Sequence, residues 1–401
     1  MTSEWHEVPL RELVGYISKG IAPSYAEEAS ETTIRVLNQK CNRNFRISYG
    51  DSRLHDTLKK KVPPERYVKP DDILINSTGA GTAGRIAQIE DVPSATTIDG
   101  HMILIRSNGK VTQKFLGYAL KAHQWEVLQL DEGSTGQTEL NRDRLLDEIM
   151  INYPVSFDEQ NAIVGTLESI DRKLIVNEQL NDNLEQQAQS YFQELFVDNA
   201  DPEWAIGTIS DLGTIVGGST PSKAKPEYYT ESGIAWITPK DLSINKSKFV
   251  SHGENDITEL GLKNSSAAIM PEGTVLFSSR APIGYIAIAA GEVTTNQGFK
   301  SVVPKPEIGT PFVYFFLKNT LPVIEGMASG STFKEVSGST MKNVPAVIPD
   351  AETLAKFSDF CAPIFAQQRI LEEQNQSLAT LRDNLLPKLM SGEIDVSAVQ
   401  L

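Results

Sequence analysis

The sequence predicts an α/β (α+β) chain of two globular domains in tandem repeat. Each domain is followed by a long helix, and we expect the two helices to pair as an antiparallel coiled coil. Three observations support this: 401 residues suit two domains of ordinary size, the two halves repeat each other in order, and each half ends in a long heptad stripe. The predicted segments are globular domains at 1–155 and 201–350, a long helix at 156–200, and a second long helix with a C-terminal tail at 351–401.

Composition places the chain among globular proteins. It is 40% hydrophobic and 22% charged, which allows substantial cores. No apolar run approaches the roughly 20 residues that span a bilayer, and the start, MTSEWHEVPL, lacks a signal-peptide pattern. Cys41 and Cys361 lie far apart, so we expect no disulfide framework and a cytoplasmic location. No histidine lies at ligand spacing to another His or Cys, so no metal site is predicted.

The two halves of the chain match in register. Trp5 in SEWHEVPLREL corresponds to Trp204 in PEWAIGTISDL. PDDILINSTGAGTAGRIA is echoed by PEGTVLFSSRAPIGYIA, which pairs Gly84 with Gly284. Because only two copies occur, the pattern indicates a duplicated domain rather than a solenoid.

The glycine-rich stretch STGAGTAG invites comparison with a phosphate cradle. A P-loop needs a lysine after its glycines, and neither copy has one there. We therefore predict a tight turn between two strands, with Gly84 and Gly284 supplying positive φ. A turn that also approaches a polymeric phosphate backbone stays open. The neighbouring Asp71-Asp72 pair is interpreted as a solvated start of a strand rather than a catalytic dyad.

Each copy ends in a helical pattern. Ser156 and Glu159 form a capping box ahead of the first, and Asp350 is a suitable cap for the second. Forty residues make a helix of about 60 Å, which exceeds what a small domain needs to cover its own core. Two such helices with heptad stripes most simply pack on each other. The polar members of the stripes, which we expect to fix the register of the pair unless they lie exposed, are Asn177, Asn181 and Asn375.

Charge is distributed unevenly. The net charge is −15, and residues 156–200 alone hold 9 acidic and 2 basic residues. Residues 35–69 reverse the balance, with ten basic residues against three acidic ones. An acidic chain can therefore still present a basic face, which is what contact with nucleic-acid phosphates requires.

Signatures of catalysis are missing from the sequence. We find no Walker A motif, no Gly-rich cofactor loop opening a helix, no amino-methyltransferase (D/N)PP(Y/F) motif, and no H-E-x-x-H or G-x-S-x-G. Two domains joined by long helices without a catalytic centre suit a molecular ruler. DNA is a natural object for it, because half-sites lie at defined distances along the duplex.

This layout resembles the specificity subunit of type I restriction-modification systems over nearly the whole chain. In the second copy the resemblance rests on GGSTPSKAKPEYY, IAWITPKDLS and VLFSSRAPIG, and in the first on DDILINSTGAGTAGRIA. The first helix keeps the Asp-Glu-Gln lead-in at Asp158, whereas the second lead-in, VPAVIPDAETLAKF, departs from the usual pattern.

The resemblance implies a non-catalytic subunit with two target-recognition domains, each reading one half of a bipartite sequence in double-stranded DNA. It implies that the helices dock two modification (methyltransferase) subunits, that restriction subunits join the complex, and that the complex defends against foreign DNA. S-adenosylmethionine, ATP and Mg would bind the partner subunits and no cofactor would bind this chain. The alternative is a non-catalytic coiled-coil scaffold or adaptor whose globular domains bind protein.

Candidate DNA contacts follow from side-chain chemistry, because Lys and Arg suit phosphates while Arg, Asn and Gln suit base edges. The phosphate candidates are Arg43, Arg46, Lys59, Lys60, Lys61 and Lys223. The base-edge candidates are Lys240, Arg280, Asn296 and Gln297. The alternative for any of them is a solvated charge or a turn-stabilising amide, and for Arg280 an internal ion pair that braces the Gly284 turn.

Overall fold

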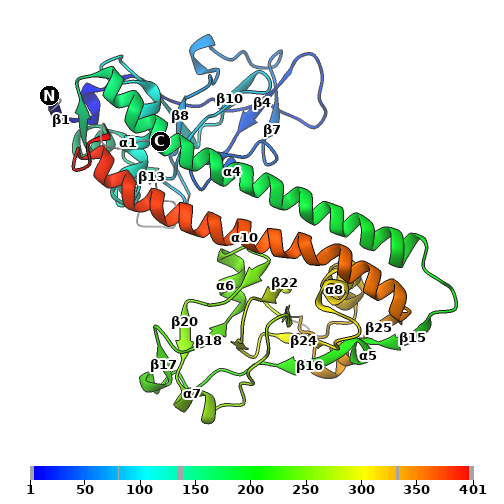
Figure 1. The fold of residues 1–401 in the computed structure, drawn as a ribbon. Coiled ribbons are helices and arrows are strands. Elements are labelled where there is room, and N and C mark those ends of the chain that lie inside the picture. Colours follow the sequence, from blue (N-terminus) through cyan, green and yellow to red (C-terminus); the bar gives the residue numbers. More distant parts are fainter. Residues whose placement is uncertain (1–3, 80, 133–138, 331–333, 397–401) are drawn as a thin grey trace. The chain divides into compact units, whose positions relative to one another are not determined.

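The computed structural model describes residues 4–79, 81–132, 139–330 and 334–396. The chain divides into two compact units (Figure 1). Unit 1 comprises Met1–Lys173 with Leu378–Leu401, and unit 2 comprises Leu174–Ser377. Two long helices, α4 (Phe157–Gln193) and α10 (Ala351–Met390), each contribute one part to each unit. The tandem domains and the two long helices confirm the predicted fold class.

Unit 1 is built on a four-stranded antiparallel sheet covered by helices. In sheet order the strands are β2 (Val14–Lys19), β11 (Met102–Ser107), β8 (Ile73–Asn76) and β9 (Ile86–Gln88). The shorter helices are α1 (Gln113–Ala122), α2 (Gln124–Leu128) and α3 (Arg142–Glu148). The first part of α4 and the last part of α10 enter the same core, where Phe115, Leu167 and Leu389 are fully buried.

A second sheet of unit 1 carries the basic segment 35–69. In order it consists of β10 (Thr96–Ile98), β4 (Thr33–Leu37), β7 (Arg53–Asp56) and β3 (Tyr25–Ala26), with β10 parallel to β4. Three strand pairs complete the unit: β1 (Trp5–Pro9) with β14 (Met150–Pro154), β5 (Asn42–Arg43) with β6 (Arg46–Ile47), and β12 (Asp131–Glu132) with β13 (Glu139–Leu140).

Unit 2 repeats this plan. Its larger sheet runs β16 (Gly213–Gly217), β24 (Lys300–Pro304), β21 (Val275–Ser279), β22 (Ile283–Ala289) and β19 (Phe249–Val250). Its second sheet runs β17 (Tyr229–Thr230), β20 (Asn255–Ile257), β18 (Ile234–Ile237) and β23 (Thr294–Thr295), and β15 (Ala205–Thr208) pairs with β25 (Pro345–Ile348). The helices are α5 (Ile209–Leu212), α6 (Pro239–Ile244), α7 (Glu259–Lys263), α8 (Thr310–Gly326) and α9 (Gly338–Lys342).

The strand order shows the duplication directly. β2-β11-β8-β9 in unit 1 corresponds to β16-β24-β21-β22 in unit 2, and β10-β4-β7-β3 corresponds to β23-β18-β20-β17. In both second sheets one pair is parallel, β10 with β4 and β23 with β18. Such agreement in order and direction confirms the tandem repeat that the sequence predicts.

The glycine-rich stretches form the predicted turns. β8 pairs with β9, and β21 with β22, antiparallel in both cases. Gly84 has φ of 84° and Gly284 of 95°, a region that L side chains rarely adopt. Space is also short, because a Cβ at Gly84 would lie 2.9 Å from the Val127 carbonyl oxygen, and one at Gly284 2.7 Å from Leu321. The persistence of glycine at both positions follows from conformation and close packing.

The interpretation of Asp71-Asp72 as a solvated strand start is wrong for Asp72. Its side chain is buried and receives two hydrogen bonds of 2.7 Å from the Arg106 guanidinium. The Lys69 backbone N–H donates a third, also 2.7 Å long. Arg106 lies on β11 beside β8, so the sheet itself creates the ion pair, and no local sequence pattern announces it.

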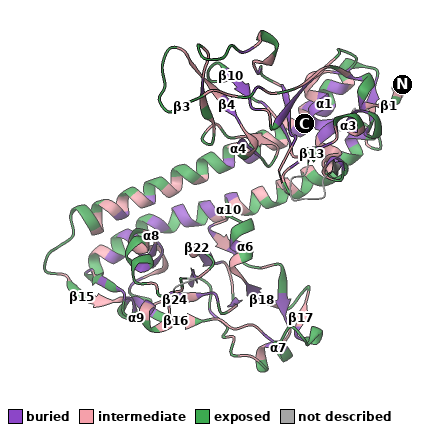
Figure 2. Cartoon of the chain, turned by 180° about the vertical axis from the view of Figure 1, so that it is seen from behind, coloured by how far each residue is buried: buried purple, intermediate pink, exposed green. Residues whose placement is uncertain are grey.

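The two long helices run antiparallel in each unit. In unit 2, Asn177 Nδ2 donates to Asn375 Oδ1 over 2.9 Å, and Asn181 Nδ2 donates to Glu372 Oε1 over 3.2 Å. Numbers that rise along α4 therefore meet numbers that fall along α10, as Figure 1 shows for this unit. Buried positions recur at intervals along both helices (Figure 2), as the heptad stripes predict.

The three stripe asparagines occupy the seam rather than the surface. Asn177 is fully buried, and Asn181 and Asn375 are half-buried. The side-chain oxygens of Asn177 and Asn181 lack a hydrogen-bond partner within the described residues. A buried polar oxygen without a partner costs free energy, so these residues trade stability for a defined register.

A buried charge cluster attaches the globular part of unit 2 to its helices. Glu185 of α4 accepts hydrogen bonds from Lys248 (2.7 Å), Lys318 (2.5 Å) and the Tyr314 hydroxyl (3.1 Å). Lys248 also donates to Gln368 of α10, over 2.8 Å. Burial alone would raise the pKa of Glu185, but the two ammonium groups outweigh it and hold the pKa at about 2. Burial lowers the pKa of Lys248 to about 8, against the attraction of Glu185.

We predict that Glu185→Gln destabilises unit 2 by about 3 to 5 kcal/mol, because Lys248 would remain buried without a counter-ion. Glu373→Gln is the control, since its pair with Arg369 is exposed and worth less than about 1 kcal/mol. Denaturant titration at neutral pH measures both. The folded pKa of Glu185 lies below its ordinary 4.5, so its contribution is present above pH 4.5 and fades toward pH 2. Equal destabilisation of the two variants would contradict the cluster's role.

Candidate nucleic-acid interface

Four of the predicted contact residues line one hollow in unit 2. The hollow has a volume of about 390 Å³ and lies where β18 ends. Lys223, Lys240, Asn296 and Gln297 all face it, together with Thr220, Glu254 and Asn255. Lysine and amide side chains that converge on one concave surface can donate to phosphates and to base edges.

The start of α6 forms one wall of this hollow. Thr238 follows β18 and caps α6, where its N–H and Oγ1 donate to Asp241 Oδ2 over 2.7 and 2.6 Å. The other carboxylate oxygen of Asp241 accepts the Glu254 N–H at 2.9 Å. Both carboxylate oxygens of Asp241 thus hold the surrounding backbone in place. Lys240, in the first turn of α6, is exposed.

The four side chains differ in whether they already form hydrogen bonds with other residues of the chain. Lys240 donates to Glu254 over 2.5 Å, and this bond raises the pKa of the Lys240 ammonium group. Gln297 Oε1 accepts from the Thr220 hydroxyl. Asn296 Oδ1 accepts the Gly298 N–H at 2.8 Å, so its carbonyl matches the alternative of a turn-stabilising amide. Lys223 is exposed and has no side-chain partner within the described ranges.

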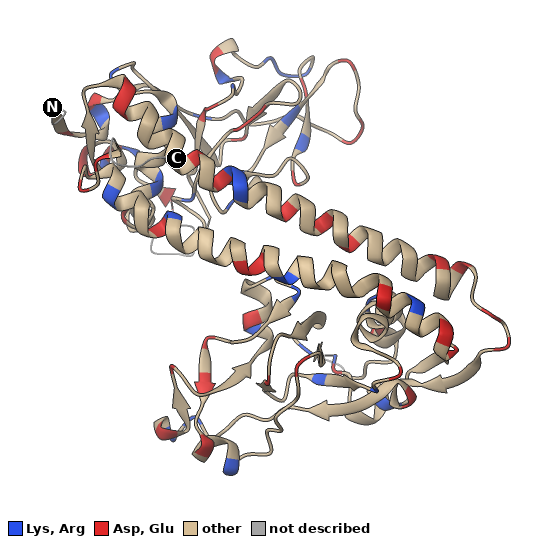
Figure 3. Ribbon diagram, in the orientation of Figure 1, with Lys and Arg blue, Asp and Glu red and all other residues tan. Residues whose placement is uncertain are grey.

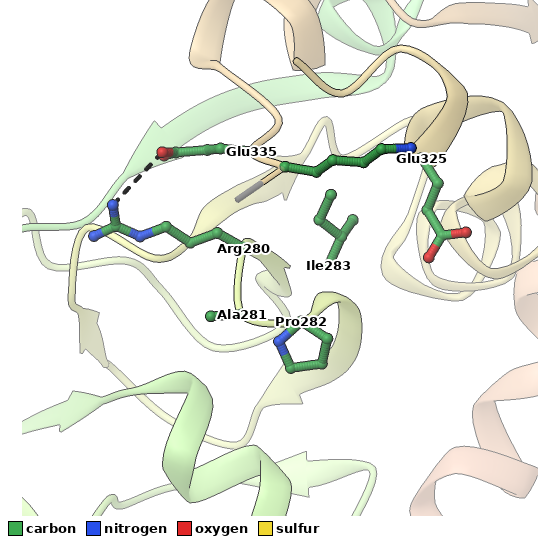
Figure 4. Close-up of a pocket in the computed structure, with 7 residues that line it drawn as sticks. Arg280, Ala281, Pro282, Ile283, Glu325 and Glu335 are labelled. Atoms are coloured by element: carbon green, nitrogen blue, oxygen red, sulfur yellow. Dashed lines mark ion pairs between the residues drawn. The ribbon is translucent and has the colours of Figure 1, made fainter. Parts of the chain in front are cut away.

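Arg280 lies apart from these four. It borders another pocket, of about 610 Å³, with Pro282, Ile283 and Glu325 (Figure 4). Its guanidinium points toward Glu335 and lies 3.5 Å from that carboxylate. The geometry therefore matches the alternative of an internal ion pair, with Glu335 as partner.

The unit 1 candidates are spread over two surface segments. Arg43 and Arg46 lie opposite each other in the β5–β6 hairpin. Lys59, Lys60 and Lys61 follow β7 and are all exposed.

The three lysines are held differently. Lys59 lies 3.8 Å from Asp56, and Lys60 Nζ donates to the Ala22 carbonyl over 2.8 Å. Lys61 has no side-chain partner in the part of the chain that is described. Exposed, weakly paired ammonium groups of this kind suit contacts with a phosphate backbone.

The candidates did not include Lys40 and Arg53, two exposed cations of unit 1. Lys40 follows the end of β4, and Arg53 begins β7 with its guanidinium 3.3 Å above the Tyr25 ring. The signal for Lys40 was in the sequence, because RVLNQKC aligns with AWITPKD and places Lys40 on Lys240.

Comparison with known proteins identifies the family. The sequence model of the type I restriction modification DNA specificity domain matches residues 2–186 and 202–381. The chain belongs to this family. Within the described ranges, no helix has the length and apolar character needed to cross a membrane, and no three His, Cys, Asp or Glu side chains are grouped to hold a metal ion.

Members of the family are similar to the chain in sequence and fold. It is 38% identical over 194 residues to the type I restriction enzyme MjaIX specificity subunit of Methanocaldococcus jannaschii, covering 46% of this chain and 45% of the relative. It is 28% identical over 194 residues to the HindI specificity subunit of Haemophilus influenzae, covering 48% and 42%. Each alignment thus spans about half the length of the curated relative.

A solved structure shares the fold. The type I restriction-modification system S subunit from M. genitalium superposes with a TM-score of 0.60 at 18% identity, over 97% of this chain and 96% of that one. The shared fold therefore extends over both copies and both long helices of this chain.

We predict that changing Lys59, Lys60 and Lys61 together to Ala weakens binding to random-sequence duplex DNA. The plot of log affinity against log salt should become shallower by up to about 0.9 for each DNA phosphate that the variant no longer neutralises. Fluorescence anisotropy over a series of salt concentrations measures the slope.

The matched control changes Lys110, Lys173 and Lys305 to Ala, three exposed lysines elsewhere on the chain. It alters net charge equally, so a specific contact surface should separate the two triple variants. Identical slopes in the two variants would place Lys59–Lys61 away from the duplex.

Proposed function

We propose that this chain is the sequence-specific DNA-recognition subunit of a type I restriction-modification complex. Each target-recognition domain, 1–155 and 201–350, reads one half of a bipartite site. The observation that carries this proposal is the duplication, since the same framework of two sheets occurs once in each unit. Two separately evolving readers on one scaffold are what a split recognition sequence needs.

The helical segments 156–200 and 351–401 set the spacing between half-sites and dock two modification subunits. Antiparallel pairing with a fixed register supports the first role. Exposed apolar side chains support the second: Val176 and Leu180 lie one turn apart on α4, and Ile370 is exposed on α10. Acidic side chains recur along α4 (Figure 3), which favours a protein partner over DNA on that surface.

The chain supplies the address and its partners supply the chemistry. Modification subunits would transfer a methyl group from S-adenosylmethionine, and restriction subunits would use ATP and Mg for cleavage. The absence of cofactor motifs from the sequence supports this division, and we expect the complex to act in the cytoplasm.

Exchanging domains tests the assignment of one half-site to each copy. Residues 201–350 are replaced by the same segment of a relative with another target, while both helices are kept. Sequencing of methylated sites in cells with the modification subunits should then show that only one half of the motif has changed. The chain without those subunits should transfer no methyl groups. A change in both halves or in neither would contradict one reader per domain.

Lengthening the helix pair tests the spacer. Seven residues are inserted into α4 after Gln179 and seven into α10 after Glu373, so that antiparallel partners move together. Seven residues add about 10 Å, or roughly three base pairs of 3.4 Å, and return the stripe to nearly the same face. We expect both half-sites to persist with a longer spacer. Insertion in α4 alone is the control, because it separates Asn181 from Glu372 and should impair activity. An unchanged spacer with full activity would contradict the ruler.

A further inference from the structure

The strand end that borders the hollow of unit 2 has an equivalent in unit 1 that the sequence disguises. At the end of β4, the Leu37 carbonyl accepts the Asp99 N–H at 2.9 Å, and at the end of β18 the Ile237 carbonyl accepts the Asn296 N–H at 3.0 Å. These bonds make Asp99 and Asn296 equivalent. Gly20 confirms the match, because a Cβ there would lie 2.2 Å from the Asp99 carbonyl oxygen.

The same glycine contact occurs in unit 2. A Cβ at Gly218 would lie 2.0 Å from the Asn296 carbonyl oxygen, as at Gly20 in unit 1. Beyond these glycines the two loops differ in length, and strand pairing gives the match: Tyr25 of β3 pairs with His55, and Tyr229 of β17 pairs with Ile257, the residue equivalent to His55. Tyr25 is therefore equivalent to Tyr229, and Lys223 lies in the longer loop between β16 and β17.

The turns after the two strands also correspond. Asn38 caps a 3₁₀ turn at Gln39–Cys41, as Thr238 caps α6. The Cys41 sulfur accepts the Asn38 N–H at 3.5 Å, the role that Asp241 has in unit 2. Lys40 and Lys240 are therefore equivalent, each one residue before the side chain that closes the cap.

Strand pairing gives the remaining position. Val36 of β4 pairs with Arg53, and Trp236 of β18 pairs with Asn255. Because Val36 and Trp236 each precede the strand-end residue, Arg53 and Asn255 occupy the same place.

Residues with a structural role are kept between the two copies, whereas exposed residues beside them differ. The tight glycines, the helix caps and the lysine after the cap keep their roles. An exposed position beside them changes chemistry, because Arg53 in unit 1 corresponds to Asn255 in unit 2. A frame that is kept while its exposed side chains diverge is expected of two sites that recognise different sequences.

Resting on the proposed function, we propose that these strand-end clusters read the bases of the two half-sites. In unit 1 the readers are Lys40 and Arg53, with Tyr25 beneath the guanidinium. In unit 2 they are Lys240, Asn255 and Gln297. Arginine pairs in bidentate fashion with guanine, and Asn or Gln with adenine. Stacking on Tyr25 holds the Arg53 plane for such a contact. The unit 1 half-site therefore contains a guanine read by Arg53, and the unit 2 half-site an adenine read by Asn255.

Selection from a random-sequence duplex library by the full chain tests the inference. The wild-type protein should enrich a two-part motif. Arg53→Ala should abolish the preference for one guanine in one half, and Asn255→Ala the preference for one adenine in the other half. Each variant should discriminate roughly tenfold to a hundredfold less at its position. The half that stays unchanged in each variant shows that the chain is folded.

Matched controls are Arg142→Ala in unit 1 and Asn264→Ala in unit 2, exposed residues of the same types away from the clusters. Both should retain the full motif. If the wild-type motif has two parts and Arg53→Ala and Asn255→Ala keep both unchanged, the base-reading assignment is overturned while the proposed function stands. A wild-type protein that enriches no two-part motif would overturn the proposed function and this inference with it.

Discussion

A partly buried carboxylate on α4 attaches the globular part of each unit to the helix pair, and the rest of the structure depends on it. In unit 1, Asp171 accepts from Tyr118 and Lys121 of α1 and from Arg382 of α10. In unit 2, Glu185 has this role, and its partner Lys318 matches Lys121 in the repeat. A buried ion needs its partners in one geometry, whereas apolar contacts tolerate sliding. The carboxylates therefore define how each globular part is oriented on its helices, as the proposed reading of spaced half-sites would require.

Sequence periodicity predicted the features that are set by residues close together in the chain. The helices, the repeat and the turns at Gly84 and Gly284 follow from spacing, caps and positive φ, and the structure confirms them. Asn177 and Asn375 could be placed on facing stripes for the same reason, and the structure brings them together.

Contacts between distant segments could not be read in this way. Glu185 meets Lys248 and Lys318 across 63 and 133 residues, and Asp72 meets Arg106 across 34. Lys240 and Gln297 were candidates because of their side-chain chemistry, and the structure places both on one hollow. Lys40, the unit 1 counterpart of Lys240, could have been found by aligning RVLNQKC with AWITPKD. The match of Asp99 with Asn296 is harder to find, because TTID is one residue longer than TTN and only backbone hydrogen bonds reveal it.

The register of the helix pair is fixed by contacts that no shifted arrangement could keep. Asn177 meets Asn375, Asn181 meets Glu372, and one turn further Glu185 accepts from Gln368. Glu372 also accepts the backbone N–H groups of Lys248 and Phe249, so sliding the helices would detach β19 as well. A slip of one heptad would retain much of the apolar seam, since leucines recur at that interval, but it would break all of these bonds. The amide oxygens of the seam that lack a partner among the described residues are the cost of excluding that slip, and the proposed spacing of half-sites along DNA gives a reason for it.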